Sequence, residues 1–275
     1  MNLLLAAESC PPENPNCFHV PTLEELFEFA PLFGEGLFAF NRVSLLYVLA
    51  AIIVCALFIA ALRNPTIVPG KLQGIVEGIV GFVRDQIALE VIGPAGLKFV
   101  PFLTALFMFI FVNNFYEIMP LVQLPSTGRM AVPAFLAFTV WCVYLVVGAK
   151  EQGIIGFWKN ALLGIEMPAA VRIIYIPVEF AQLLIVRPLT LAIRLFANMM
   201  AGHILLAVIF IAANAFLIGF HGEFAINFKA LPIGLVALAA GPAMVAFELM
   251  VGALQAYIFT ILAAVYIAGS VHADH

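Results

Sequence analysis

Long runs with few or no charged residues dominate the pattern of hydrophobic and polar positions along this chain. An α-helix rises 1.5 Å per residue, so about twenty apolar residues are enough to cross the hydrocarbon layer of a membrane. Three runs have about this length. They predict membrane-spanning helices over residues 43–62, 99–119 and 133–149.

Residues 70–90 follow a different pattern. Apolar residues recur at every third or fourth position, and polar residues such as Gln73, Glu77 and Arg84 occupy the opposite side of the predicted helix. This pattern is typical of an amphipathic helix that lies in the membrane interface instead of spanning it.

The last hundred residues predict two helices that are longer than a membrane is thick. Residues 172–219 and 231–270 are almost uninterrupted helical patterns, each about 60 to 70 Å long at the usual rise. Either each folds back at a kink, for which Pro177, Pro188 and Pro242 are candidates, or both cross the membrane strongly tilted as a hairpin.

The composition agrees with a lipid environment. Of 275 residues, 64% are hydrophobic and 10% are charged, whereas ordinary soluble domains carry about 25% charged residues. We therefore expect an all-α integral membrane protein with five to six membrane helices, formed by a single domain over residues 41–275.

The first forty residues differ in composition from the rest. Residues 1–40 contain six glutamates and no lysine or arginine, which indicates a segment outside the cytoplasm. Cys10 and Cys17 lie in this segment, either as a disulfide or as free thiols.

Basic residues predict the orientation. With residue 1 outside, seven lie on the cytoplasmic side and three outside, so the C-terminus is expected in the cytoplasm and the protein in the cell (inner) membrane. The seven are Arg63, Lys71, Arg84, Lys98, Lys150, Lys159 and Arg172, and the three are Arg42, Arg129 and Lys229.

Several function classes are not supported by any motif. The chain has no glycine-rich phosphate loop, no His-Glu-x-x-His pair and no cluster of basic residues. We therefore expect no cofactor, no metal and no nucleic-acid partner.

Four ionisable residues stand out within the apolar stretches: Arg194, His203, Glu248 and, less deeply, Glu179. Such residues are costly in a membrane and usually mark ion pathways. Arg194 is a permanent cation, and no acid lies one turn away on its own helix. Its counter-charge is therefore expected from elsewhere, although snorkelling of the side chain to the interface is the alternative.

A helical wheel with 100° per residue separates these groups. Arg187, Arg194 and Asn198 fall on one stripe, while His203 lies nine residues beyond Arg194 and shares the opposite stripe with Asn214. The two stripes do not join, so Arg194 is separated from His203 and Asn214 around the helix. A proton path that is divided by a barrier needs such an interruption.

The final helix carries its own polar stripe. Glu248, Gly252 and Gln255 follow one another at spacings of four and three residues, which puts them on one face. From the sequence alone, His203 and Glu248 are as consistent with a static buried pair as with a proton relay.

Two motifs in these helices carry a resemblance. The sequences RPLTLAIRLFANMMAGH at 187–203 and LQAYIFT at 254–260 resemble subunit a of the bacterial F-type rotary ATP synthase. The segments VPGKLQ at 68–73 and PFLT at 101–104 also resemble that family in order and spacing. The resemblance extends over residues 63–270.

The resemblance implies a proton-conducting, non-catalytic stator subunit with two half-channels. It implies that Arg194 faces the carboxylate of the rotating c-ring, with Gln255 and Asn198 near it, and that His203 and Glu248 form the outer half-channel. In some familiar bacterial members the acid and the imidazole are exchanged between the two helices. The implied partners are the c-ring, subunit b of the peripheral stalk and the remaining synthase subunits.

A secondary set of candidates completes the predicted site. Glu179 lies one residue further from Pro188 than expected for the family's inner half-channel acid. Polar clusters at the end of a span are more often interfacial caps than channel residues, and residues 113–117 are such a cluster. The secondary candidates are Glu179, Gln182, Thr190, Asn113, Asn114, Glu117 and Asn214.

Two functions from other classes remain as alternatives. A secondary transporter would use Arg194 to bind an anionic substrate and would contain an inverted repeat, which the sequence does not contain. A membrane enzyme would use His203 and Glu248 as acid and base, but it would need a nucleophile or metal cluster nearby.

Overall fold

The computed structural model describes residues 31–33, 40–119, 126–163, 168–218 and 231–271. Apart from a short antiparallel pairing of β1 (Pro31–Phe33) with β2 (Phe40–Asn41), the described regular structure is helical. The predicted all-α membrane fold is confirmed, because five helices are long and apolar enough to cross a membrane. The predicted segment 1–40, with Cys10 and Cys17, lies almost wholly outside the described residues.

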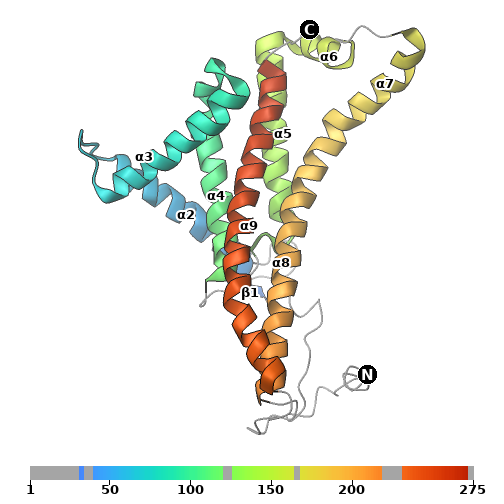
Figure 1. Cartoon of the computed structure of the whole chain (residues 1–275). Coiled ribbons are helices and arrows are strands. Elements are labelled where there is room, and N and C mark those ends of the chain that lie inside the picture. The colour runs from blue at the N-terminus through green and yellow to red at the C-terminus, as the bar shows by residue number, and fades with distance from the viewer. Residues whose placement is uncertain (1–30, 34–39, 120–125, 164–167, 219–230, 272–275) are drawn as a thin grey trace.

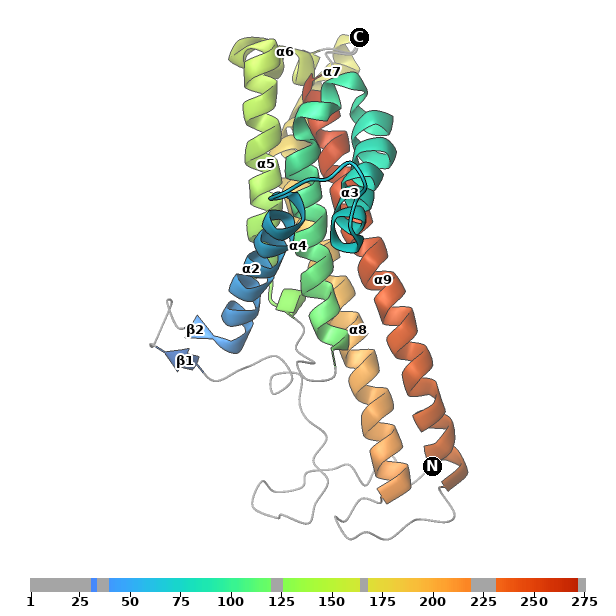
Figure 2. The same cartoon turned by 90° about the vertical axis from the view of Figure 1, so that its left-hand side faces the viewer.

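The three shorter predicted spans are present. They are α2 (Arg42–Leu62), α4 (Val100–Ile118) and α5 (Ala131–Gln152). A 3₁₀ turn, η4 (Pro94–Phe99), leads into α4, and another, η5 (Ser126–Gly128), precedes α5. Figure 2 places α2 beside α4, against which it packs.

The amphipathic segment forms a separate helix that is not among the candidate spans. It consists of α3 (Lys71–Val83) and the π-helical η3 (Arg84–Ile92). Val76, Val83 and Ile87 are fully buried, as the spacing of apolar residues predicts. On the exposed side, the Arg84 guanidinium holds the pKa of Asp85 below its ordinary value through a 2.7 Å hydrogen bond.

The two long helices are continuous. The first consists of α7 (Ala169–Ala181), the π-helical η6 (Gln182–Val186) and α8 (Arg187–Ile218). The second is α9 (Leu231–Val271), which continues through Pro242. Neither folds back at a proline, so the long hairpin is the correct one of the two expectations.

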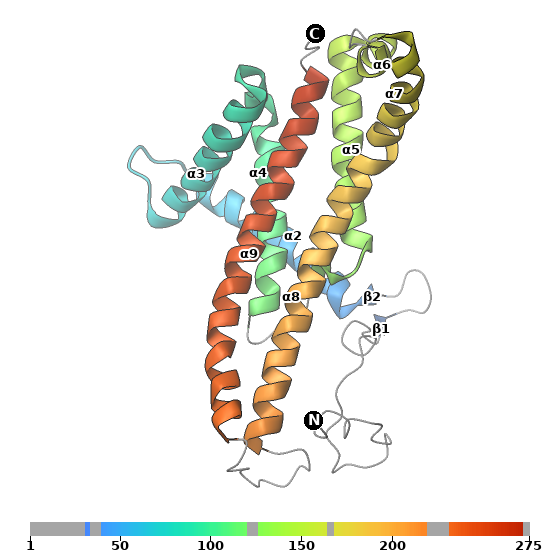
Figure 3. The ribbon, with the colours of Figure 1, turned by 45° about the vertical axis from the view of Figure 1, so that its right-hand side comes forward.

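The hairpin and α5 form the centre of the bundle. Helices α8 and α9 pack side by side near their connection, and they diverge toward the other end of the molecule (Figures 1 and 3). Helix α5 contacts both of them. The main apolar core lies among these helices and α4, with Leu103, Tyr144, Leu195 and Phe259 almost completely buried.

Several helix ends meet at the wide end of the bundle. Lys98, before α4, forms an ion pair with Glu151 in the last turn of α5. The Gln152 amide donates a 2.9 Å hydrogen bond to the carbonyl of Ser270 in α9. After Gly153, whose φ of 77° ends α5, the short helix α6 (Ile154–Leu163) turns away from the bundle.

Candidate functional site

A buried acid and an imidazole link α4 to α8. The Nδ1 atom of His203 lies 3.6 Å from Oε1 of Glu117, and the Glu117 side chain is almost fully buried. Glu117 lies in the last turn of α4, whereas His203 lies halfway along α8. Helix packing therefore joins two residues that are far apart in the sequence.

Glu248 adds a second carboxyl group from α9. It is 4% exposed, and its carboxyl group lies directly against the backbone of Gly202, where a Cβ atom would overlap it. Glu117 of α4 is close enough to Glu248 to interact with it electrostatically. Glu117, His203 and Glu248 thus form one cluster, which we call the acid–imidazole cluster, with one member from each of three helices.

The polar stripe of α9 faces the interior of the bundle, as its spacing predicts. Glu248, Gly252 and Gln255 are all buried. The Asn114 amide donates a 2.9 Å hydrogen bond to the Gly252 carbonyl and accepts one of 3.3 Å from the Thr127 hydroxyl. The Nε2 atom of Gln255 has no hydrogen-bond partner among the described residues.

The polar residues of α4 are not interfacial caps, and that expectation is wrong. Asn113, Asn114 and Glu117 are at most 4% exposed. Asn113 donates a 2.7 Å hydrogen bond to the Phe109 carbonyl of its own helix, while Asn114 and Glu117 contact α9 and α8. The amphipathic turn at the end of α4 faces other helices instead of the membrane surface.

Arg194 lies on the outer side of α8. It is exposed, whereas Leu191, Leu195 and Met199 on the same helix are buried. Within the described ranges, Arg194 forms no ion pair and no hydrogen bond. Asn198, one turn further on, is half-buried.

The cation is separated from the acid–imidazole cluster in two ways. The separation of nine positions between Arg194 and His203 corresponds to about 14 Å along the axis of α8. Around the axis, Arg194 is exposed while Gly202, beside His203, is buried against Glu248.

A second acid lies on the other side of Arg194 along the chain. Glu179 accepts a 3.2 Å hydrogen bond from the Arg187 guanidinium, and both side chains are partly buried. The guanidinium also stacks over the Tyr266 ring of α9, 5.5 Å from its centroid. The sequence did not predict this pairing, because the two residues are eight positions apart across a helix irregularity.

That irregularity is the π-helical turn η6. A π-turn contains more residues than an α-turn and leaves its backbone groups differently paired. The Leu183 carbonyl in η6 accepts hydrogen bonds from Trp141 (3.2 Å) and Tyr144 of α5. The sequence has one more residue between Glu179 and Pro188 than the family resemblance led us to expect. A π-turn accommodates one such extra residue.

Comparison with known proteins decides the family. The model of the ATP synthase A chain family matches residues 44–268. The chain belongs to the ATP synthase A chain family. The resemblance found in its motifs is thereby confirmed.

Relatives in this family are similar over nearly the whole chain. ATP synthase subunit a of Rhodococcus erythropolis (strain PR4 / NBRC 100887) is 36% identical over 258 residues, which cover 94% of this chain and 92% of the relative. ATP synthase subunit a of Parafrankia sp. (strain EAN1pec) is 40% identical over 260 residues, covering 92% and 84%. That of Streptomyces lividans is 37% identical over 257 residues, covering 90% and 86%.

The remaining candidates of this A chain do not join the acid–imidazole cluster. Gln182 is exposed at the start of η6. Thr190 is exposed, and its hydroxyl donates a 2.7 Å hydrogen bond to the Val186 carbonyl. Asn214 belongs to α8, but its side chain is outside the described part. Among the described residues, no group of three or more His, Cys, Asp or Glu could hold a metal ion.

Sequence reasoning missed one contributor to the A-chain site. Gly202 appeared only as a letter of the motif, yet its missing side chain is what admits the Glu248 carboxyl group. The available signal was a glycine next to a histidine in the middle of an apolar helix, since glycine is unfavourable in a helix interior unless packing requires it.

Proposed function

We propose that this chain is the proton-conducting stator subunit of the membrane sector of an F-type ATP synthase. It provides two half-channels and the arginine that exchanges protons with a ring carboxylate, and it performs no covalent chemistry itself. The observation that carries this proposal is that Arg194 is exposed and has no ion-pair partner in the described part of the chain, about 14 Å along α8 from the acid–imidazole cluster.

The acid–imidazole cluster forms the outer half-channel. A proton that arrives at Glu117 can pass to the Nδ1 atom of His203, 3.6 Å away, and from the imidazole toward Glu248. Carboxyl groups and an imidazole can each accept and donate a proton, so these three residues can pass a proton from one to the next. Asn113 and Asn114 line the same side of α4.

Arg194 separates the two half-channels. Its guanidinium stays protonated at any physiological pH and has no counter-charge among the described residues. A protonated carboxyl group of a neighbouring c-ring releases its proton to the inner half-channel, and the resulting carboxylate is attracted to Arg194. The carboxylate then takes up another proton from the outer half-channel before it rotates into lipid. Because the cation is fixed, a proton does not pass directly between the half-channels.

Gln255 and Asn198 complete the surroundings of the arginine. Asn198 lies one turn beyond Arg194 on α8, and Gln255 contributes a buried amide nitrogen that has no partner among the described residues. Amide groups can bond both a carboxylate and a protonated carboxyl group. They therefore suit a site at which the partner changes charge.

The inner half-channel follows η6. Glu179 is the acid nearest to its start, and it lies 3.2 Å from the Arg187 guanidinium. Gln182 and Thr190 are exposed polar residues on the same stretch of chain. This half-channel opens toward the wide end of the bundle, which the count of basic residues assigns to the cytoplasm.

The remaining assignments follow from the same orientation. Residues 1–40 form an acidic extracytoplasmic segment, the C-terminus is cytoplasmic, and subunit b of the peripheral stalk holds the chain against rotation. Each proton supplies about 2.3 kcal/mol per 100 mV of membrane potential. Several protons must therefore drive the rotor before one ATP is made elsewhere in the complex.

The transporter alternative has less support. An anionic substrate would need Arg194 to line an enclosed pocket, but the side chain is exposed on the outer side of α8. An exposed cation in a membrane fits a partner chain that brings its own carboxylate.

Cysteine cross-linking tests the proposal without requiring activity. In a chain without other cysteines, a cysteine replacing Ala201, which is exposed two turns from Arg194, should cross-link to a cysteine near the ring carboxylate. The buried control Leu206→Cys should not. Equal cross-linking of both positions, or of neither in the assembled complex, would contradict the proposal.

A further inference from the structure

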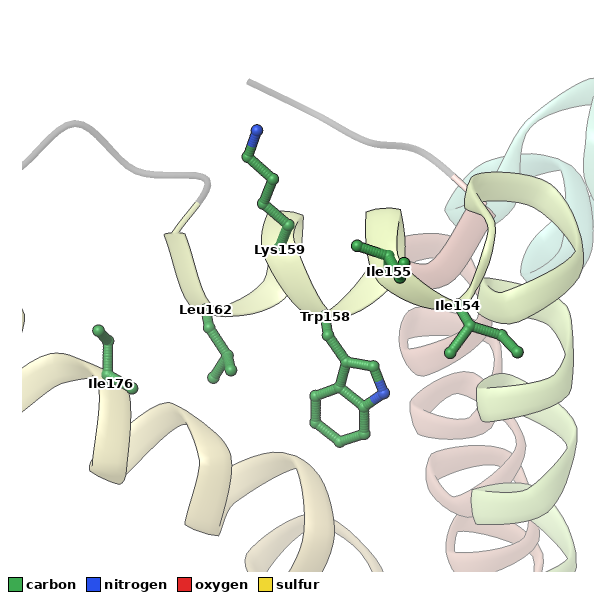
Figure 4. Close-up of a pocket in the computed structure, with 6 residues that line it drawn as sticks. All are labelled: Ile154, Ile155, Trp158, Lys159, Leu162 and Ile176. Atoms are coloured by element: carbon green, nitrogen blue, oxygen red, sulfur yellow. The ribbon is translucent and has the colours of Figure 1, made fainter.

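An open apolar cleft lies between α6 and α7, away from the acid–imidazole cluster. Its volume is about 490 Å³, within the range of about 300–1,000 Å³ for ligand pockets. Figure 4 displays the residues that line it, which are Ile154, Ile155, Trp158, Lys159, Leu162 and Ile176. Five of the six are apolar, so the cleft offers little to a water-soluble ligand.

The cleft is at the level where a membrane meets water. Helix α6 begins directly after the span α5, and α7 begins the next span. In Figure 4 the side chains of Trp158 and Leu162 extend from α6 toward α7, whereas Lys159 points to the other side of α6. A short helix with tryptophan below and lysine above is typical of the interface.

Each wall of the cleft carries one exposed cation. Lys159 belongs to α6, and Arg172 lies one helical turn before Ile176 on α7, hence on the same side of that helix. Neither forms an ion pair with any described residue. The cleft thus has an apolar interior, and each of the two helices that form it carries one exposed cation.

We propose that this cleft binds an anionic phospholipid. One acyl chain fills the space between Trp158, Leu162 and Ile176, and the phosphate group lies at the edge between Lys159 and Arg172. A zwitterionic lipid would fill the same space, but its own cation would oppose the two basic side chains. Binding should therefore select for net negative charge in the headgroup.

The fluorescence of Trp158 reports on the cleft directly. The full chain with Trp141→Phe is placed in phosphatidylcholine nanodiscs that contain a small fraction of lipid with brominated acyl chains, which quench tryptophan on contact. Brominated phosphatidylglycerol should quench at a lower mole fraction than brominated phosphatidylcholine, by about five-fold for each cation. Lys159→Gln and Arg172→Gln should each reduce the preference for phosphatidylglycerol about five-fold.

Two controls keep the result interpretable. Lys150→Gln removes an exposed cation of α5 that does not line the cleft, and it should leave the preference unchanged. The chain with Trp158→Phe keeps Trp141, and subtracting its signal from that of the native chain gives the Trp158 quenching without any change in α5.

Three results would overturn the proposal. Equal quenching by the two lipids would identify ordinary boundary lipid. An unchanged preference in both Lys159→Gln and Arg172→Gln would show that these cations do not bind the phosphate. An absence of quenching by either lipid would mean that protein, and not lipid, covers the cleft.

Discussion

His203 of α8 faces Glu117 of α4, with 3.6 Å between Nδ1 and Oε1. The partner suggested by the motifs alone is Glu248, whose carboxyl group lies against Gly202, the residue before His203. His203 and the adjacent Gly202 therefore contact acids from two different helices. A proton relay with three members depends on both acids, which leads to separate predictions.

Glu117→Gln removes one acid while keeping the shape of the side chain. Because the amide cannot accept the proton, ATP-driven proton pumping into vesicles should slow by about 10²-fold. Initial rates of vesicle acidification measure this. The matched control is Glu90→Gln, an exposed glutamate in η3, which should pump normally. Normal pumping by the Glu117 variant would exclude it from the relay.

Gly202→Ala tests the placement of Glu248. The added Cβ atom overlaps the carboxyl group, so Glu248 must move away from its position against Gly202. A displacement of about 1 Å at a proton-transfer site can cost about a hundred-fold in rate, and ATP synthesis in vesicles should fall accordingly. Gly81→Ala, where nothing lies within 4 Å of the new atom, is the control. Full ATP synthesis in the Gly202 variant would refute this role.

Gln255→Leu separates function from stability. The buried Nε2 atom has no partner among the described residues, so its removal should leave the free energy of unfolding unchanged or raise it by up to about 1–3 kcal/mol. Coupled ATP synthesis should nevertheless be lost. Thermal unfolding in detergent and ATP synthesis in vesicles are measured on the same preparation.

For Gln152→Leu we expect the opposite result, a loss of stability without a loss of function. Its amide donates to the Ser270 carbonyl, so its loss should lower the free energy of unfolding by about 1 kcal/mol with ATP synthesis retained. If Gln255→Leu behaved like Gln152→Leu, Gln255 would be a structural residue and not part of the site.

The spans could be predicted from the sequence because their physics is local. A run of about twenty apolar residues specifies a membrane helix whatever surrounds it, and α2 and α4 begin and end close to the predicted positions. The prolines were less informative. Pro242 lies inside α9 without ending it, since neighbouring groups can satisfy the freed carbonyl in a membrane bundle.

The partners of the site residues could not be predicted, because they depend on how helices pack. Helix periodicity placed Glu248 and Gln255 on one face, but it gave no indication that Glu117 would face His203. The π-turn η6 is stabilised by Trp141 and Tyr144 of another helix, and no local pattern encodes it. Single-residue irregularities of this kind determine where Glu179 meets Arg187.

The central claim concerns Arg194, and the most direct test is Arg194→Ala in the assembled complex in vesicles. The account predicts complete loss of coupled ATP synthesis, together with a passive proton leak through the membrane sector because the fixed cation no longer separates the half-channels. The control is Arg63→Ala, which removes an exposed cation at the end of α2. This variant should retain coupled ATP synthesis and show no passive proton leak. Coupled ATP synthesis at the native rate by the Arg194→Ala complex would contradict the account.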